Sequence, residues 1–315
     1  MEKITVLVSN VRKLCDEVFE YTFVSKSNNE LPSYSPGSHI DVFVSDTIVR
    51  QYSLIGSGDT TDHYRIAVQR EQNGRGGSVS LIERFRVGSL VKISEPRNNF
   101  KLVDSDESIL LAGGIGITPL IGMAEYLFKK QKKFSLNYFC RTKSRKIAIQ
   151  EVCPSLDPKL FKVHCDDDPL VERNPLEKIL ANPQKNTHIY FCGPTGFMNK
   201  VIDLTSQWPK ENLHKESFAA KATEDQKDLQ AFDVTLSKSG RVITVNASES
   251  ILDAFKRSGV EVSSSCESGL CGSCKVRYTQ GEPIHNDLVL TDDERRTHML
   301  ICVSRPSSNN LVLEI

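Results

Sequence analysis

The stretch that decides the fold is Ser265-Cys266-Glu267-Ser268-Gly269-Leu270-Cys271-Gly272-Ser273-Cys274, followed after a further 27 residues by Cys302. Spacings of four, two and then many residues between cysteines are typical of a plant-type 2Fe-2S cluster. The intervening glycines and serines let the backbone wrap closely and aim its N–H groups at the sulfurs. A four-thiolate zinc site is the alternative, but zinc ribbons usually pair two Cys-x2-Cys knuckles. We therefore predict iron ligation by Cys266, Cys271, Cys274 and Cys302.

The sequence on either side of this loop predicts a small α+β module. A hairpin-like pair (233–236 and 241–245) precedes a short helix (251–258), and a strand (311–313) follows the loop. We assign 232–315 to this domain. Residues 221–231 are polar and charge-rich without apolar periodicity, which predicts an interdomain linker.

Further toward the N-terminus, the pattern of apolar runs and turns indicates two other domains. In 104–220, apolar runs such as 109–112, 136–139 and 188–191 alternate with helical stretches, which predicts a parallel α/β sheet. Residues 108–128 are about as long as a membrane span, but they contain four glycines, a proline and a glutamate, so a strand, turn and helix fit better. Residues 1–103 read as short alternating strands separated by turns, which predicts an antiparallel β-barrel.

Composition narrows the class of function. The 315 residues carry 40 basic and 40 acidic side chains, so bulk charge favours neither nucleic acid nor an anionic membrane. The N-terminus lacks the layout of a signal peptide. Nine cysteines in that setting indicate a reducing compartment, the cytoplasm, where thiols serve metals or redox chemistry more often than disulfides.

Two glycine turns follow predicted strands of the parallel sheet. The first runs through Gly113, Gly114, Gly116 and Thr118 to Pro119, and the second is Cys192-Gly193-Pro194. Such turns let a pyrophosphate approach the backbone and a helix N-terminus. Ligands bind at the carboxyl ends of parallel strands, so the two turns support each other. The alternative is a pair of tight βα turns without a ligand.

Two motifs stand out in the barrel. Arg50-Gln51-Tyr52-Ser53 offers a guanidinium and an aromatic ring, and the turn 73–78 contains Gly76-Gly77-Ser78. A fixed guanidinium with a Gly-Gly-Ser turn can hold a phosphate, and a tyrosine beside it can lie against an aromatic ring. An ordinary barrel strand and hairpin loop remain the alternative.

Together these segments resemble the phthalate dioxygenase reductase family over essentially the whole chain. The resemblance implies an FMN-binding barrel, an NADH-binding domain and a ferredoxin domain, in that order. It implies FMN contacts from Arg50, Gln51, Tyr52, Ser53, Ala67, Val68, Gln69, Gly76, Gly77 and Ser78. It further implies nicotinamide-side contacts from Gly113, Gly114, Gly116, Pro119, Arg141, Gly193 and Pro194, catalytic positions at Thr118 and Cys192, and an aromatic near the flavin at Phe218.

By the same resemblance, the chain passes electrons from NADH through FMN and a 2Fe-2S cluster to the Rieske centre of a separate terminal oxygenase. We expect a monomer with no nucleic-acid or membrane partner. The tract 141–146 is basic and lacks an acid that would bind an NAD ribose, which keeps NADPH open. Two alternatives use part of the same plan: a flavohaem-type or ferric reductase, and a redox-sensing electron-transfer module with another acceptor.

Overall fold

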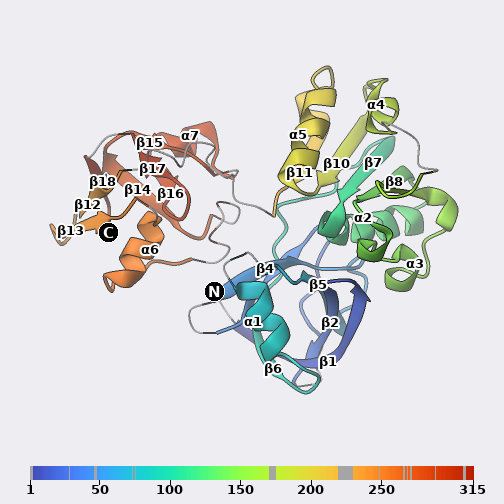
Figure 1. Ribbon diagram of the computed structural model, residues 1–315, viewed down its shortest axis with the longest axis horizontal. Coiled ribbons are helices and arrows are strands. Elements are labelled where there is room, and N and C mark those ends of the chain that lie inside the picture. The colour runs from blue at the N-terminus through green and yellow to red at the C-terminus, as the bar shows by residue number, and fades with distance from the viewer. Residues whose placement is uncertain are drawn as a thin grey trace. The chain divides into compact units, whose positions relative to one another are not determined.

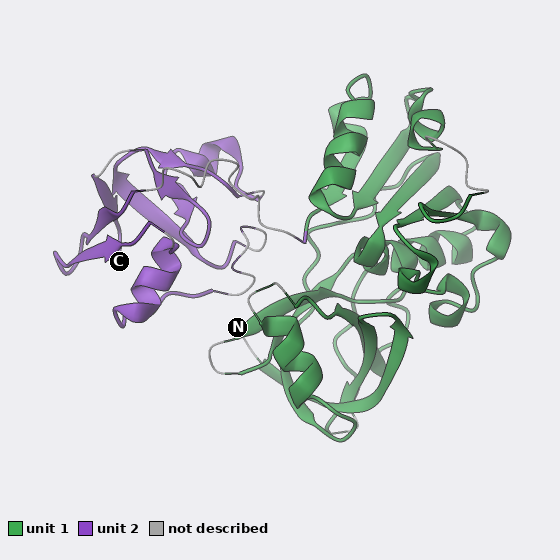
Figure 2. Cartoon of the chain, viewed as in Figure 1, with its two compact units in different colours: residues 1–217 green, residues 218–315 purple. Residues whose placement is uncertain are grey.

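The computed structural model divides the chain into two units, residues 1–217 and 218–315 (Figure 2). It describes residues 3–27, 29–45, 48–72, 74, 76–169, 175–218, 230–247, 249–264, 267, 269, 272–287, 289–307 and 310–315. Within these ranges no helix is long and apolar enough to cross a membrane. Most of the predicted linker, 221–231, lies outside the described residues.

The N-terminal part of the first unit is the predicted antiparallel barrel (Figure 1, blue to cyan). Its sheet has the strand order β4-β3-β6-β1-β2-β5, and Leu54, directly after β4, forms a bridge with Ile66 of β5. Alternating side chains fill its interior, as in small barrels generally. The elements are β1 (Lys3–Cys15), β2 (Val18–Ser25), β3 (His39–Phe43), β4 (Val49–Ser53), β5 (His63–Gln69), α1 (Gly77–Arg84) and β6 (Leu90–Ser94).

The rest of the first unit is a five-stranded parallel sheet in the order β11-β10-β7-β8-β9. The predicted strand, turn and helix at 108–128 are confirmed as β7, η1 and α2. The elements are β7 (Glu107–Gly113), η1 (Gly114–Gly116), α2 (Ile117–Lys129), β8 (Lys133–Cys140), η2 (Lys143–Arg145), α3 (Ile149–Val152), η3 (Pro158–Leu160), β9 (Phe161–Cys165), α4 (Pro175–Leu180), β10 (Thr187–Cys192), α5 (Thr195–Leu204), η4 (Lys210–Asn212) and β11 (Leu213–Glu216).

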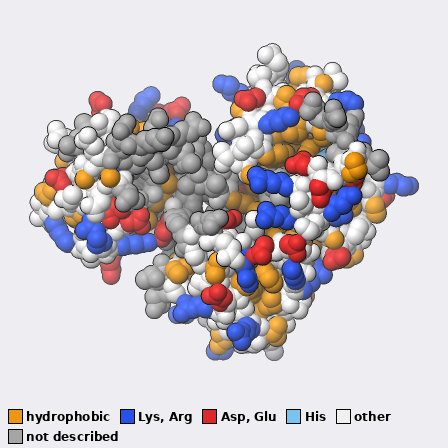
Figure 3. Space-filling view, viewed as in Figure 1, with side chains coloured by type: hydrophobic (Ala, Val, Ile, Leu, Met, Phe, Trp, Pro, Cys, Tyr) orange, Lys and Arg blue, Asp and Glu red, His pale blue; other side chains and the backbone are white. Residues whose placement is uncertain are grey.

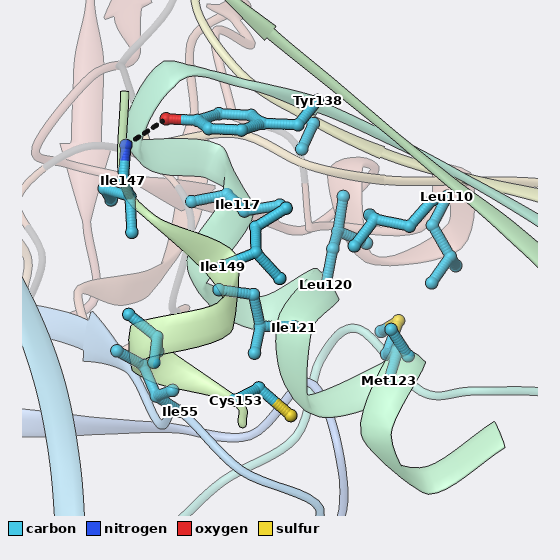
Figure 4. Close-up of a cluster of buried hydrophobic side chains, with 14 of the residues drawn as sticks. Ile55, Leu110, Ile117, Leu120, Ile121, Met123, Tyr138, Ile147, Ile149 and Cys153 are labelled. Atoms are coloured by element: carbon cyan, nitrogen blue, oxygen red, sulfur yellow. Dashed lines mark hydrogen bonds between the residues drawn. The ribbon is translucent and has the colours of Figure 1, made fainter. Parts of the chain in front are cut away.

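One hydrophobic cluster joins the barrel to the parallel sheet. Ile55 and Ala67 of the barrel pack into the same buried cluster as Ile121 of α2 and Ile149 of α3. Figure 4 shows Ile55 and Cys153 close to the α2 side chains, with Tyr138 beside Ile147. The helix also approaches the barrel at backbone distance, because a Cβ added to Gly122 would overlap the Gly56 carbonyl. Barrel and sheet therefore form one packed body within this unit.

The second unit is the predicted α+β module. Its main sheet has the order β13-β12-β18-β14-β16, with β12 and β18 parallel, and a second, two-stranded sheet pairs β15 with β17. A capping box between Ser250 and Asp253 begins helix α6. The elements are β12 (Phe232–Leu236), β13 (Val242–Val245), α6 (Ile251–Arg257), β14 (Lys275–Gln280), β15 (Pro283–Ile284), α7 (Asp292–Arg295), β16 (His298–Leu300), β17 (Arg305–Pro306) and β18 (Leu311–Leu313).

On the face shown in Figure 3, acidic and basic side chains are interspersed.

Candidate functional site

The predicted cluster loop is described in part. Cys266 and Cys271 lie outside the described residues, whereas Cys274 directly precedes β14 and Cys302 follows β16. Both described cysteines are buried and their Sγ atoms are 3.1 Å apart. A disulfide would bring the sulfurs to about 2.0 Å. Two thiolates on one tetrahedral metal ion with bonds near 2.3 Å would stand about 3.8 Å apart. The pair therefore fits ligation of one metal ion after a small outward shift.

The buried residue Asp287 packs against the predicted cluster loop at Gly269. The Asp287 carboxylate accepts hydrogen bonds from the Leu290 amide at 2.9 Å and from Arg295 at 3.3 Å. Gly269, in the cluster loop, has a φ of 72°. A Cβ there would lie 2.8 Å from Val303 and 3.2 Å from the Asp287 Cα. Glycine is required at this position both for the left-handed backbone and for the close approach.

The two glycine turns meet at the carboxyl ends of β7 and β10, which are neighbours although eight elements separate them in the chain. A Cβ on Gly193 would lie 2.9 Å from the Gly113 Cα, and one on Gly116 would overlap the Cys192 carbonyl. Strand order reverses between β7 and β10, so this is the topological switch point where ligands bind in open α/β sheets. The geometry fits a dinucleotide approaching the backbone.

Thr118 and Cys192, the two predicted catalytic residues, lie at this edge and are both buried. The Thr118 hydroxyl donates to the Ile115 carbonyl at 3.1 Å, which fixes the first turn of α2. Burial raises the pKa of the Cys192 thiol well above its usual value, and Glu216 raises it further at a pH where its carboxyl is ionised. The thiol is therefore neutral near pH 7, which is unlike the lowered pKa of a nucleophilic cysteine.

The predicted phosphate site lies at the start of a helix and not in a hairpin loop. Gly76 precedes α1 with a φ of 73°, and Gly77 and Ser78 form the first turn. A Cβ on Gly77 would overlap the Arg50 guanidinium, with Cζ only 2.6 Å away. The Arg50 guanidinium therefore lies against the helix N-terminus, where backbone N–H groups and a cation together suit a phosphate.

The end of β4 meets the end of β11. The Ser53 hydroxyl donates to the Glu216 carboxyl at 3.3 Å, and Glu216 pairs in register with Cys192. Burial raises the pKa of Glu216 to about 8. A carboxyl that stays protonated near pH 7 beside two candidate cofactor sites is a candidate functional residue. Sequence reasoning missed Glu216, since nothing local distinguishes it from other acidic residues.

Other predicted contacts are placed as follows. The Val68 side chain fills the barrel interior and Ala67 faces the cluster shared with α2, so only the backbone of these two residues is available along β5. Gln51 Nε2 is buried and has no hydrogen-bond partner among the described residues, which suits a donor reserved for a ligand. Arg141 is exposed. Phe218, also exposed, belongs to the second unit.

Three family models match successive parts of the chain: an oxidoreductase FAD-binding domain at 5–102, an oxidoreductase NAD-binding domain at 110–203 and a 2Fe-2S iron-sulfur cluster binding domain at 234–307.

Similar proteins cover the whole length of the chain. A vanillate O-demethylase oxidoreductase from Pseudomonas sp. is 37% identical over 99% of this chain and 100% of its own. A phthalate dioxygenase reductase from Burkholderia cepacia is 36% identical over 98% of this chain and 96% of its own. The solved structure of a phthalate dioxygenase reductase, described as a modular structure for electron transfer from pyridine nucleotides to [2Fe-2S], has a TM-score of 0.80. It shares 35% identity and covers 99% of this chain and 98% of its own.

Proposed function

The chain belongs to the phthalate dioxygenase reductase family, and on this premise we propose that it carries electrons from NADH through FMN and a 2Fe-2S cluster to a Rieske-type terminal oxygenase. The chain is an oxidoreductase with flavin-, NAD- and 2Fe-2S-binding domains. The proposal rests on its full-length likeness to reductases named for oxygenase systems. We propose that it works as a monomer in the cytoplasm, with domains at 1–103, 104–220 and 232–315.

The residues of the first unit would bind and orient two cofactors. When bound, flavin supplies the exchange between a two-electron nicotinamide donor and a one-electron iron-sulfur acceptor. Arg50 and the N-terminus of α1 would hold its phosphate, with Tyr52 against the ring. The turns at Gly113 and Gly193 would receive the dinucleotide. Glu216 would hold a proton at its carboxyl near pH 7, so the site carries no negative charge there.

NADH is the donor that the charge arrangement favours over NADPH. Three acidic residues, Asp166, Asp167 and Asp168, follow the neighbouring strand β9, and two of them contact Lys143 of the basic tract 141–146. The Lys143 amide donates to both Asp167 oxygens at 3.0 and 3.1 Å, and its ammonium lies 3.1 Å from Asp168. These carboxylates oppose a 2′-phosphate and can bind ribose hydroxyls. A higher kcat/KM for NADPH than for NADH would overturn this preference.

Metal analysis and electron transfer test the proposal together. We expect about two irons and one FMN per chain. A chain ending at residue 220 should still oxidise NADH with ferricyanide but lose most transfer to a Rieske partner, because its one-electron exit is gone. Zinc in place of iron, or undiminished Rieske reduction by the shortened chain, would refute the proposed electron route.

A further inference from the structure

A buried carboxylate in the barrel holds two arginines. Glu20 lies on β2 with only 3% of its side chain exposed. Arg12, on the neighbouring strand β1, donates from Nε and Nη2 to the two Glu20 oxygens, both at 3.1 Å. Arg65 on β5 brings Nη1 within 3.8 Å of the same carboxylate. A two-pronged arginine-carboxylate pair fixes both side chains far better than a surface ion pair does.

Both arginines reach from the barrel to the other half of the unit. Arg12 Nη2 donates to the Glu151 carbonyl at 3.0 Å, and Arg65 Nη1 donates to the Val152 carbonyl at 2.8 Å. Glu151 and Val152 are the last two residues of α3, where carbonyls lack helical partners and a positive charge is favourable. The arginines therefore cap α3 from outside its own domain.

The segment they hold is the one that follows β8. The β1–β2 turn adds two contacts to it: the Asp16 amide donates to the Ser144 carbonyl at 3.1 Å, and the Cys15 thiol to the Arg145 carbonyl at 3.3 Å. The side chains of Ile147, Ile149 and Cys153 pack into the buried cluster that α2 shares with the barrel (Figure 4). Residues 144–153 are thus held between the barrel and the helix that begins at the first glycine turn.

We propose that Glu20, Arg12 and Arg65 form a brace that positions residues 144–153 for nucleotide binding. Glu20 of β2 pairs in register with Ala67 of β5, and Arg65 lies on β5 two residues before Ala67. The proposed function places β5 along the flavin edge. The 141–146 loop opens at the carboxyl ends of β8 and β9, the ligand edge of the sheet. The brace therefore connects the strand beside the flavin to the loop beside the dinucleotide. This step rests on the proposed NADH-dependent function.

The test uses the full-length, cofactor-loaded protein. Glu20→Gln removes the charge that orients the two arginines, and Arg12→Ala removes one arm at a partly exposed position that tolerates truncation. Lys13→Ala is the matched control, because Lys13 lies on the same strand, is 58% exposed and pairs with Asp16 on its own hairpin. Arg12→Lys keeps the charge but cannot contact Glu20 and Glu151 through a planar fork, so it should rescue only in part.

We expect both brace variants to keep flavin and iron, and to bind NAD⁺ in calorimetry on the order of tenfold more weakly, since the loop loses a fixed geometry. Amide exchange should quicken in residues 144–153, while Glu107–Lys129 stays protected as in the control. Unchanged NAD⁺ affinity in Arg12→Ala would overturn the brace, as would an equal loss in Lys13→Ala. If Glu20→Gln fails to fold, Arg12→Ala decides alone. A wild-type protein that binds no NAD⁺ would refute the proposed function instead.

Discussion

Glu216→Gln tests whether the carboxyl at the junction of barrel and parallel sheet is neutral in the folded protein. The folded pKa is about 8 against an ordinary value of 4.5, because burial disfavours the charged form. Below pH 4.5 both folded and unfolded chains hold this proton. As pH rises, the unfolded chain releases it first, so the free energy of unfolding falls until pH passes about 8. One pKa unit corresponds to about 1.4 kcal/mol, so the wild type loses about 3 kcal/mol by pH 7.

Glutamine cannot ionise and can still accept from Ser53, so the variant should escape this loss. Wild type and variant should unfold in urea with similar stability at pH 5. At pH 7 the variant should be more stable by roughly 2–3 kcal/mol, an upper bound because Glu216 keeps partial solvent access. Trp208, the single tryptophan of the chain, is buried in the same unit and reports its unfolding by fluorescence. Exposed Glu211→Gln corrects for general effects of the substitution. A difference between wild type and Glu216→Gln that stays constant from pH 5 to 7 would show that the carboxyl is ionised and that the burial argument is wrong.

Three further predictions follow from the site. Arg50→Glu should lose flavin but keep iron, since it sets a negative charge against the phosphate; flavin absorbance after gel filtration measures this, and full retention would remove the phosphate assignment. Cys302→Ser should lose iron while keeping flavin, as metal and flavin analysis would record, because one thiolate of the predicted set is gone. Gly116→Ala should lower the melting temperature by several degrees, since its Cβ would overlap the Cys192 carbonyl, whereas Gly196→Ala, with open space around its Cβ, should not. Equal melting temperatures for the two alanine variants would contradict the proposed close packing of the glycine turns.

Local sequence patterns predicted the secondary-structure elements that depend mainly on residues close together in the chain. The strand-turn-helix at 107–129 follows from an apolar run ending in glycines ahead of a proline, and the hairpin and helix of the second unit follow from alternation and a turn. The meeting of the two glycine turns was also predictable, because the carboxyl ends of parallel strands share one edge of a sheet. Helix α1 was not predicted: its eight residues are too few for periodicity to distinguish it from a hairpin loop.

Contacts between distant segments escaped prediction. Glu216 and Ser53 are separated by 163 positions, and Arg12 and Glu151 by 139. Each residue has an ordinary neighbourhood in sequence, and only the packing of barrel against sheet brings the partners together. Asp166–Asp168 are a second example. The sequence suggested a basic loop after β8 without an acidic residue, because the acidic residues follow β9, the strand that pairs with β8.

Gly122 shows how this packing constrains the sequence at a single position. Glycine within a helix costs about 1 kcal/mol relative to alanine, and Gly122 sits inside α2 with ordinary helical backbone. Local structure gives no reason for it. The reason lies across the junction, where any Cβ would overlap the Gly56 carbonyl in the loop that follows the Arg50–Ser53 strand. Because α2 begins at the first glycine turn, this contact holds the proposed flavin and nucleotide sites at a fixed separation. A helix with a better residue at 122 would be locally more stable but would push those two sites apart.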